Sequence, residues 1–423
     1  MAKVIDLTPK HFPIIPAKEK IELPVSFDDI ELSGIKTGNL IREISNASKL
    51  KTAAKMADCI VAKSGGDYTS IQAALDVGKT NIFVKKGTYE ISSAITIMSS
   101  GVTIRGESKV NTIIKLANGA NCHVIVVGDG ATNLSDIVIE DIQLDGNKVN
   151  QTATSFGIRF WGDVQIVGGK IVAYQISKSV IKDCIIKDFL TAGIVFKRGC
   201  DNVISGNSIT GSEDGISFDN PYNCQIINNI IRDNSYADIG ANGDAFIITN
   251  NQICVNGDYG IKLIGDESVI NGNNFPVIIS DKTAIYLDTV QHAIVIGNNF
   301  HGDTGHTGIY IDSGGSNIIM GNIFTSVVYG LYGIRLYNTG HNEIIGNTIH
   351  SYTSGIYLAS GDNSIIVANR STGNKEYGIN VSDAASDNNL VVKNYLTGNT
   401  IGGLNNAGTG TIIAASTTND NVV

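Results

Sequence analysis

The sequence predicts an all-β solenoid, a stack of three-sided coils of about 23 residues each. Two recurring phrases and the lack of a helical period lead to this prediction. The first phrase is Gly-Ile followed by two strand residues, and its copies begin at Gly193, Gly215, Gly260, Gly308, Gly333, Gly355 and Gly378, with Ala284 opening a further copy. A degenerate coil near Asp238 fills the one double step. Such regular self-similarity is typical of repeat proteins, in which each repeat contacts only its neighbours.

The second phrase is Asn followed two places later by an apolar residue. Its copies begin at Asn207, Asn229, Asn251, Asn273, Asn298, Asn322, Asn347 and Asn394. Short alternating apolar runs lie between the phrases and indicate strands of four or five residues, separated by Gly, Asn and Asp. Coils stack about 4.8 Å apart, so equal positions lie above one another. We therefore expect the asparagines to form an internal hydrogen-bonded ladder at one corner.

Composition limits the class of partner. The net charge is −9 and no basic block occurs, which argues against nucleic acid. The first residues lack the apolar run of a secretory signal, and no 18-residue apolar stretch could span a membrane. The six cysteines show no metal-type spacing, so we expect buried thiols. These features predict synthesis in a reducing cytoplasm, which is compatible with a virion part released by lysis.

Residues 1 to 56 differ in kind from the rest. Four of the six prolines lie in the first 37 residues, which suit an extended arm. Leu40 to Met56 have the pattern of an amphipathic helix that is too short to be stable alone. We predict that residues 1 to 56 serve attachment or oligomerisation. A bundle of symmetry-related helices and docking on the end of the solenoid both remain open.

The segment that follows carries a family resemblance. Gly65 to Asp76, then Ile82 to Tyr89, then Val102 to Glu107 resemble the opening of pectate-lyase-like right-handed parallel β-helix proteins, a group that includes bacteriophage tailspikes. The resemblance spans residues 57 to 423 and implies a right-handed, single-stranded parallel β-helix. Its short N-terminal helix would cap the first coil with Tyr68, Ile71, Ala74 and Leu75. The resemblance also implies a homotrimer, although Gly402 to Val423 contain no recognisable trimerising domain.

Residues 109 to 192 continue with less regular coils. An insert from Asn147 to Ser155 is expected to project as a loop from one corner. The only tryptophan, Trp161, follows this insert beside Arg159. We expect Trp161 either to offer a platform for a sugar ring or to pack beneath the loop.

One outward face of the predicted stack is rich in tyrosine. In Gly-Ile-x-Leu-x the Ile and Leu side chains point inward, so the x positions point outward. These positions, with the residue before each Gly, place six candidate sugar-binding residues on one face: Tyr259, Tyr286, Tyr310, Tyr332, Tyr337 and Tyr357. Ring faces that pack on sugar C–H groups would bind a polysaccharide here. The alternative is that tyrosine is simply favoured in strands and stacks well in ladders.

Two carboxylates on that face are candidates for catalysis. Asp288 and Asp312 fall one coil apart, about 5 Å, which is near the separation found in retaining glycosidases. With Arg335 on the next coil, they also resemble the acidic calcium site and arginine base of pectate lyases, which makes calcium a candidate cofactor. The alternative is a structural role near turns. His306, in the loop that starts at Phe300, is expected to overhang the same face and contact substrate.

These observations favour a tailspike-like virion protein of the phage tail, made in the host cytoplasm and attached through residues 1 to 56. It would bind a host cell-surface polysaccharide, and whether it also depolymerises that polysaccharide is left open. The first alternative is a free extracellular polysaccharide lyase or hydrolase, which would need an export signal. The second is a structural or adhesive surface filament, in which the tyrosines would form a packing surface.

Overall fold

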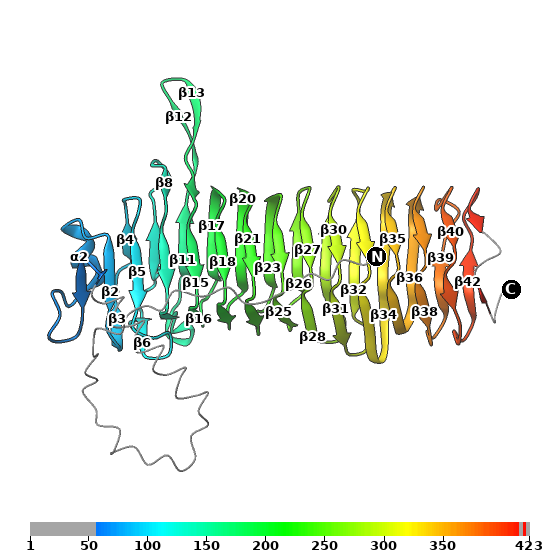
Figure 1. The fold of residues 1–423 in the computed structure, drawn as a ribbon, viewed down its shortest axis with the longest axis horizontal. Coiled ribbons are helices and arrows are strands. Elements are labelled where there is room, and N and C mark those ends of the chain that lie inside the picture. The colour runs from blue at the N-terminus through cyan, green and yellow to red at the C-terminus, as the bar shows by residue number, and fades with distance from the viewer. Residues whose placement is uncertain (1–55, 414–417, 420–423) are drawn as a thin grey trace, which may run out of the picture. The chain divides into compact units, whose positions relative to one another are not determined.

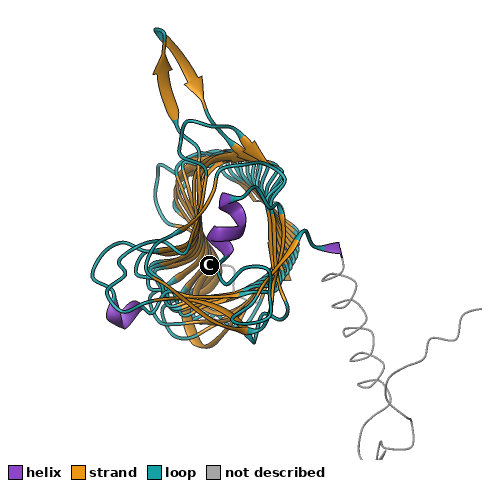
Figure 2. Ribbon diagram, turned by 90° about the vertical axis from the view of Figure 1, so that its left-hand side faces the viewer, coloured by secondary structure: helices purple, strands orange, loops and turns teal. Residues whose placement is uncertain are grey.

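The computed structural model describes residues 56–413 and 418–419. The predicted arm and helix over residues 1 to 56 lie outside the described residues except for Met56. The described residues form the predicted stack of parallel β-coils (Figure 1). Seen along the stack, each coil has three sides (Figure 2). Between residues 57 and 413, helix is confined to two short segments, α2 (Ile71–Asp76) and the 3-10 helix η2 (Lys148–Asn150).

The first strand of each coil joins a parallel sheet of 15 strands. The strands of this sheet are β1 (Cys59–Val61), β2 (Asn81–Val84), β5 (Thr103–Gly106), β9 (Val138–Glu140), β15 (Val180–Lys182), β18 (Val203–Ser205), β21 (Gln225–Ile227), β24 (Ile247–Thr249), β27 (Val269–Asn271), β30 (Ile294–Ile296), β33 (Ile318–Met320), β35 (Glu343–Ile345), β37 (Ile365–Val367), β40 (Leu390–Val392) and β43 (Ile412–Ile413).

The other two sides belong to one sheet of 27 strands, because β34 (Ile323–Gly340) and β36 (Thr348–Asp362) run around the corner between them. The second side of the coils also contains β3 (Gly87–Ile91), β6 (Thr112–Leu116), β10 (Gln143–Asp145), β16 (Ile185–Lys187), β19 (Ser208–Thr210), β22 (Ile230–Arg232), β25 (Gln252–Val255), β28 (Asn274–Ile278), β31 (Asn299–Gly302), β38 (Arg370–Thr372), β41 (Tyr395–Leu396) and β44 (Thr418–Asn419).

The third side carries the predicted tyrosine face. Its strands, besides β34 and β36, are β4 (Ile95–Ile97), β7 (Ile125–Val127), β11 (Phe156–Trp161), β17 (Ala192–Cys200), β20 (Asp214–Tyr222), β23 (Ala237–Asp244), β26 (Tyr259–Ile264), β29 (Thr283–Asp288), β32 (Thr307–Asp312), β39 (Tyr377–Val381) and β42 (Gly402–Asn406). Two short strands, β8 (Leu134–Ser135) and β14 (Ile176–Ser177), extend it at one corner.

An antiparallel hairpin projects from the stack, formed by β12 (Val164–Val167) and β13 (Lys170–Ala173) (Figures 1 and 2). The sequence analysis did not predict it, although two apolar runs flank Gly168-Gly169, a strong hairpin signal. The insert from Asn147 to Ser155 contains η2 and exposes Val149.

The N-terminal helix caps the stack as the resemblance implied. Ser70 is the N-cap, and its hydroxyl accepts a hydrogen bond from the backbone N–H of Ala73. Ile71 and Ala74 are buried, and Tyr68 and Leu75 pack against the core. Figure 2 shows α2 lying across the open end of the coils. The helix therefore covers apolar side chains that the first coil would otherwise expose.

Inward-pointing isoleucines, leucines and phenylalanines fill the interior. The phenylalanines stack between coils, with ring centroids 4.2 Å apart for Phe160 and Phe196 and 4.5 Å apart for Phe300 and Phe324. The six cysteines are free. The prediction that they are buried is correct for three of them, and Cys122, Cys200 and Cys254 are only partly buried.

The asparagine ladder is present and has nine members, because Asn369 continues it although the residue two places later is polar. Each ladder residue is at most 2 % exposed. In the middle of the ladder, the amide of Asn298 donates to Asn322 Oδ1 at 3.0 Å and to the carbonyl of Ile270 at 2.9 Å. Asn298 Oδ1 in turn accepts from the backbone N–H and the side-chain amide of Asn273. The corner thus satisfies its buried polar groups coil by coil.

Close packing between coils explains the recurring Gly-Ile. A Cβ atom on Gly308 would lie 2.6 Å from the carbonyl oxygen of Gly333 on the next coil and 2.5 Å from the ring of Phe324. Both contacts are shorter than atoms tolerate, so residue 308 has to be glycine to keep these coils at strand spacing. The same position holds Ala284 and Asp238 in two other coils.

Candidate functional site

The predicted outward face exists, because its residues are backbone neighbours on successive coils. Tyr286 of β29 pairs with Tyr310 of β32, and Asp288 pairs with Asp312 in the same ladder. Tyr310 then pairs with Arg335 of β34. Arg335 pairs in turn with Tyr357 of β36. These successive backbone partners form one column of side chains along the stack, which Lys262 begins because it pairs with Tyr286. We call these residues, together with Lys262, Tyr259, Tyr332 and Tyr337, the tyrosine face.

The rings of this face pack on one another along the stack. Tyr259 and Tyr286 are stacked, with centroids 5.1 Å apart and an interplanar angle of 16°. Tyr310 has Tyr286 on one side, at 5.1 Å, and the guanidinium of Arg335 over its ring at 4.4 Å. Both faces of Tyr310 are therefore covered. The expectation that these ring faces are free for sugar C–H groups is wrong for Tyr286 and Tyr310, because the spacing of the coils brings the rings into contact with each other.

Asp312 is the centre of a hydrogen-bond network. Its Oδ2 accepts from the hydroxyl of Tyr286 at 3.1 Å and from that of Tyr310 at 3.3 Å, and its Oδ1 accepts from Ser313 Oγ at 3.4 Å. Burial raises the pKa of Tyr286, and the neighbouring carboxylates of Asp288 and Asp312 raise it further. Burial likewise raises the pKa of Tyr310. Both phenols therefore stay protonated and can donate.

Two cations share the column with the tyrosines. Lys262 Nζ lies 3.0 Å from the hydroxyl of Tyr236 and is near the rings of Tyr259 and Tyr286, at 5.4 and 5.9 Å. Arg335 is held among three rings, at 4.4 Å from Tyr310 and 5.5 Å from both Tyr332 and Tyr337. Among the described residues, neither cation forms an ion pair with a carboxylate.

The remaining predicted tyrosines flank this arrangement. Tyr332 packs against Tyr357 with centroids 4.5 Å apart. Tyr337 is 42 % exposed and is the most accessible ring near Arg335. The face therefore presents carboxylate oxygens, phenol hydroxyls, ring edges and a guanidinium over neighbouring coils.

His306 does not overhang the tyrosine face. It is fully buried, its Nε2 lies 2.8 Å from the hydroxyl of the buried Tyr352, and its Nδ1 contacts the carbonyl of Asp303. Burial lowers the pKa of His306. The ring fits inside because Gly302 and Gly330 leave space beside it. The prediction that His306 contacts substrate from a surface loop is therefore wrong.

Trp161 lies on the same side of the stack but far from the tyrosine face. Five coils, or about 24 Å, separate it from Asp288. The guanidinium carbon of Arg159 lies 4.2 Å from the centroid of the Trp161 ring. The indole Nε1 is buried and has no hydrogen-bond partner among the described residues. The structure thus does not bring Trp161 together with the other predicted sugar-binding residues.

Two carboxyl groups near the tyrosine face have raised pKa values. Burial raises the pKa of Asp214 to about 6, and its side chain accepts a hydrogen bond from the backbone N–H of Ala237 at 3.3 Å. Burial also raises the pKa of Asp238 well above its usual value. Asp238 Oδ1 accepts a hydrogen bond from Asn234 Nδ2 at 2.8 Å, while its Oδ2 is buried and finds no partner in the part of the chain that the structure describes. Asp238 occupies the position of Gly215 in the preceding coil, which marks the degenerate repeat.

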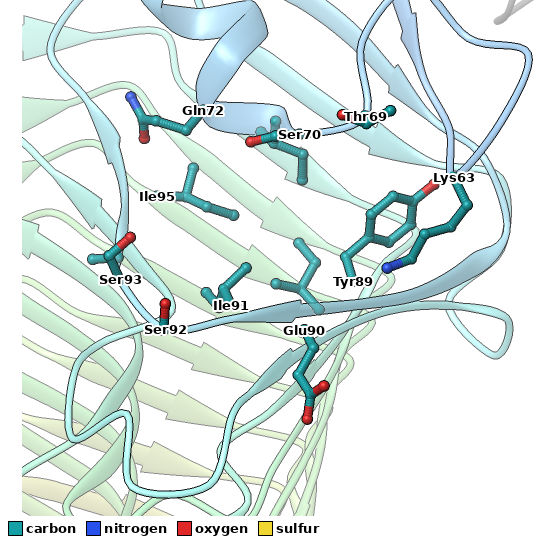
Figure 3. Close-up of a pocket in the computed structure, with 13 residues that line it drawn as sticks. Lys63, Thr69, Ser70, Gln72, Tyr89, Glu90, Ile91, Ser92, Ser93 and Ile95 are labelled. Atoms are coloured by element: carbon teal, nitrogen blue, oxygen red, sulfur yellow. The ribbon is translucent and has the colours of Figure 1, made fainter.

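A cavity of about 240 Å³ lies at the capped end, between α2 and the connection from β3 to β4 (Figure 3). Lys63, Ser92 and Ser93 line it, and the hydroxyl of Tyr89 is turned to the carbonyl of Lys85 at 2.8 Å. Among the described residues that line it, Glu90 alone carries a carboxylate. The cavity is remote from the tyrosine face and holds no pair of catalytic groups.

Two other findings apply to residues 56–413. No group of three or more His, Cys, Asp or Glu side chains there is arranged to hold a metal ion, and the calcium site stays a prediction. No helix within the same residues is long and apolar enough to cross a membrane.

Known proteins agree with this architecture. The family described as "Right handed beta helix region" matches residues 100–275 and 283–423, about three quarters of the chain. The chain belongs to this right-handed β-helix family. No curated protein shows significant similarity to the sequence.

Several solved structures share the fold at low sequence identity. The A-module of mannuronan C-5 epimerase AlgE4 from Azotobacter vinelandii is 18 % identical, with a TM-score of 0.57 over 86 % of this chain and 99 % of that one. The Dettilon tailspike protein gp208 is 16 % identical, with a TM-score of 0.55 over 84 % and 68 %. DFA-IIIase from Arthrobacter chlorophenolicus A6 is 13 % identical, with a TM-score of 0.51 over 84 % and 90 %. At these identities the likeness concerns the fold alone.

Proposed function

We propose that the chain binds a cell-surface polysaccharide along the tyrosine face, as a tailspike-like virion protein does. The observation that carries the proposal is the network at Asp312, with Asp288 beside it on the preceding coil. Carboxylates accept hydrogen bonds from sugar hydroxyls, and phenols can both accept from and donate to them. The guanidinium of Arg335 can only donate, and it adds further N–H groups to the face. The repeat of these groups along the stack suits a ligand that is itself a repeating chain.

The structural neighbours support the class of ligand. One is named for an epimerase of mannuronan and another is a tailspike protein. Because a β-helix hosts several unrelated functions, the fold adds weight only together with the polar groups of the tyrosine face.

Binding to a panel of bacterial capsular and lipopolysaccharide glycans tests the proposal. We expect at least one glycan to bind the full chain. Asp312→Asn should weaken that binding about tenfold, because the glycan would lose a hydrogen bond to a charged carboxylate. Asp201→Asn is the matched control, because Asp201 also accepts a side-chain hydrogen bond across one coil, from Asn223 at 2.7 Å. Failure to bind any glycan, or equal losses in both variants, would contradict the proposal.

Cleavage of the bound polysaccharide is a second candidate function. It is favoured by Asp288 and Asp312, which pair across one coil spacing of about 4.8 Å, close to the separation of the two carboxylates in retaining glycosidases. Arg335 lies on the next coil as a candidate base. Shortening of the polysaccharide, measured by size-exclusion chromatography and lost in Asp288→Asn and Asp312→Asn, would support it. Binding without shortening would leave a pure binder.

Attachment to a virion tail through residues 1 to 56 and assembly into a homotrimer belong to the same proposal. The mass in solution of the full chain, compared with that of a chain lacking residues 1 to 55, tests the trimer and the part of these residues in it. Binding of the two chains to virions that lack the protein tests the attachment. We expect a trimer for the full chain and a smaller species after truncation. A full-length monomer would contradict the trimer.

A further inference from the structure

We propose that Arg335 forms a subsite for a carboxylate group, so that the polysaccharide bound by the tyrosine face is an acidic one. This inference rests on the proposed function and specifies its substrate. It follows from the contacts of Arg335 and Asp312, which bind tyrosine side chains and form no ion pair with each other.

Arg335 forms no ion pair with any carboxylate of the described residues. Asp312 lies on the preceding coil, yet its Oδ2 is taken by the hydroxyls of Tyr286 and Tyr310. The guanidinium of Arg335 lies over the ring of Tyr310, and the hydroxyl of the same tyrosine donates to the carboxylate of Asp312. The tyrosines thus occupy the groups that would otherwise form an ion pair, and Arg335 keeps its charge available for a ligand.

The guanidinium is positioned by ring contacts and not by hydrogen bonds. Its carbon lies 4.4 to 5.5 Å from the ring centroids of Tyr310, Tyr332 and Tyr337. Its Nε is buried without a hydrogen-bond partner, and no hydrogen bond joins its Nη groups to the described residues. A guanidinium stacked on rings still presents N–H groups in its own plane, where a planar carboxylate can accept two of them.

Lys262, the second cation of the column, is far enough from Arg335 for one polysaccharide chain to contact both. Lys262 is three coils before Arg335, or about 14 Å along the stack. Tyr286 and Tyr310 lie between them. A polysaccharide lying along the column would place acidic groups near both cations and hydroxyl groups near Asp288 and Asp312.

Overall charge cannot produce this preference. The chain carries a net charge of −9, which repels a polyanion as a whole. Any preference for a carboxylated glycan has to come from local groups. Arg335 and Lys262 are the cations of the tyrosine face, and neither forms an ion pair among the described residues.

The experiment compares uronate-containing bacterial capsular polysaccharides in native and carboxyl-reduced form, which differ only in the acidic group. We expect the full chain to bind a native form about tenfold more tightly than its reduced form. Arg335→Gln should bring this ratio close to one, because it removes the group that distinguishes the two forms, and Arg335→Lys should keep part of the preference.

Arg370→Gln is the matched control, because Arg370 also lies over a tyrosine ring, that of Tyr395 at 5.0 Å, on another side of the coils. It should leave the ratio unchanged. Equal affinity for native and reduced forms, or an unchanged ratio in Arg335→Gln, would overturn the inference while the proposed function stands. Equal binding of a sulfated neutral polysaccharide would overturn the choice of a carboxylate. Absence of binding to every glycan would overturn both proposals.

Discussion

The hydroxyl of Tyr286 reaches across one coil to the carboxylate of Asp312, at 3.1 Å. This contact joins two rungs of the stack through side chains, next to the backbone ladder that already joins them. It also fixes the direction of the Asp312 carboxylate, which is the centre of the proposed binding face.

Tyr286→Phe tests this contact. The ring stays, so the stacking on Tyr259 is kept, while the half-buried Asp312 loses one donor. We expect a loss of about 1 kcal/mol in the free energy of unfolding, measured by denaturant titration, and weaker glycan binding. Tyr259→Phe is the control for stability, because its hydroxyl makes no hydrogen bond within the described residues. Equal losses in the two variants would show that the hydrogen bond to Asp312 contributes nothing.

The sequence could predict the column that holds Tyr286 because the repeat has a nearly constant period and strands alternate their side chains. It could not predict that Tyr310 is covered on both faces. Ring orientation depends on the neighbours at coil spacing, and the contact with Arg335 appears only when both side chains are placed. Aligning the repeats in the sequence therefore locates the tyrosine face, but it overestimates the area of tyrosine ring that a ligand can contact.

Asn298→Ala tests the internal ladder. The variant removes the acceptor that the backbone N–H and the side-chain amide of Asn273 share in a buried corner. Unsatisfied buried groups of this kind predict a loss of about 3 kcal/mol in the free energy of unfolding. Asn299→Ala is the matched control, since the exposed side chain of Asn299 bonds to the Asn274 side chain on the surface, and its backbone bond to Asn273 is kept in the variant. We expect a small effect there, and comparable losses would contradict the ladder's role.

Gly308→Ala tests the packing that explains the Gly-Ile phrase. Its Cβ would overlap Phe324 and the carbonyl of Gly333, so the coils would have to separate locally. We expect a loss of about 1–3 kcal/mol in stability, as for other overpacked interiors. Gly240→Ala is the control, because its Cβ would meet nothing closer than 3.9 Å. Thermal unfolding of the two variants should differ clearly, and identical midpoints would contradict the account.

The burial of His306 and the projecting hairpin show two kinds of limit on the sequence analysis. His306 is buried because Gly302 and Gly330, on its own coil and the next, leave room for its ring, and Tyr352 lies further along the stack. That arrangement joins residues whose closeness no local pattern reveals. The hairpin around Gly168-Gly169 is different, since its two apolar runs and the glycines between them form a local signal within ten residues of sequence.

Asp238→Asn tests the buried carboxyl through the pH dependence of stability. In the folded chain the pKa of Asp238 lies well above the value of 3.8 expected for an unfolded chain. The free energy of unfolding is therefore highest, as far as Asp238 is concerned, below pH 3.8, where this residue is protonated in both states. It falls as the pH rises from 3.8 toward the pKa of Asp238 in the folded chain, because the unfolded chain then releases the proton more readily. Asn stays neutral, so the variant should gain stability relative to the natural chain by up to about 1.4 kcal/mol per pH unit over that interval. Unfolding measured between pH 4 and 7 checks this, with Asp233→Asn as the control that removes an exposed charge. A stability difference that does not change with pH in Asp238→Asn, or that changes equally in the control, would mean that Asp238 is not held protonated by burial.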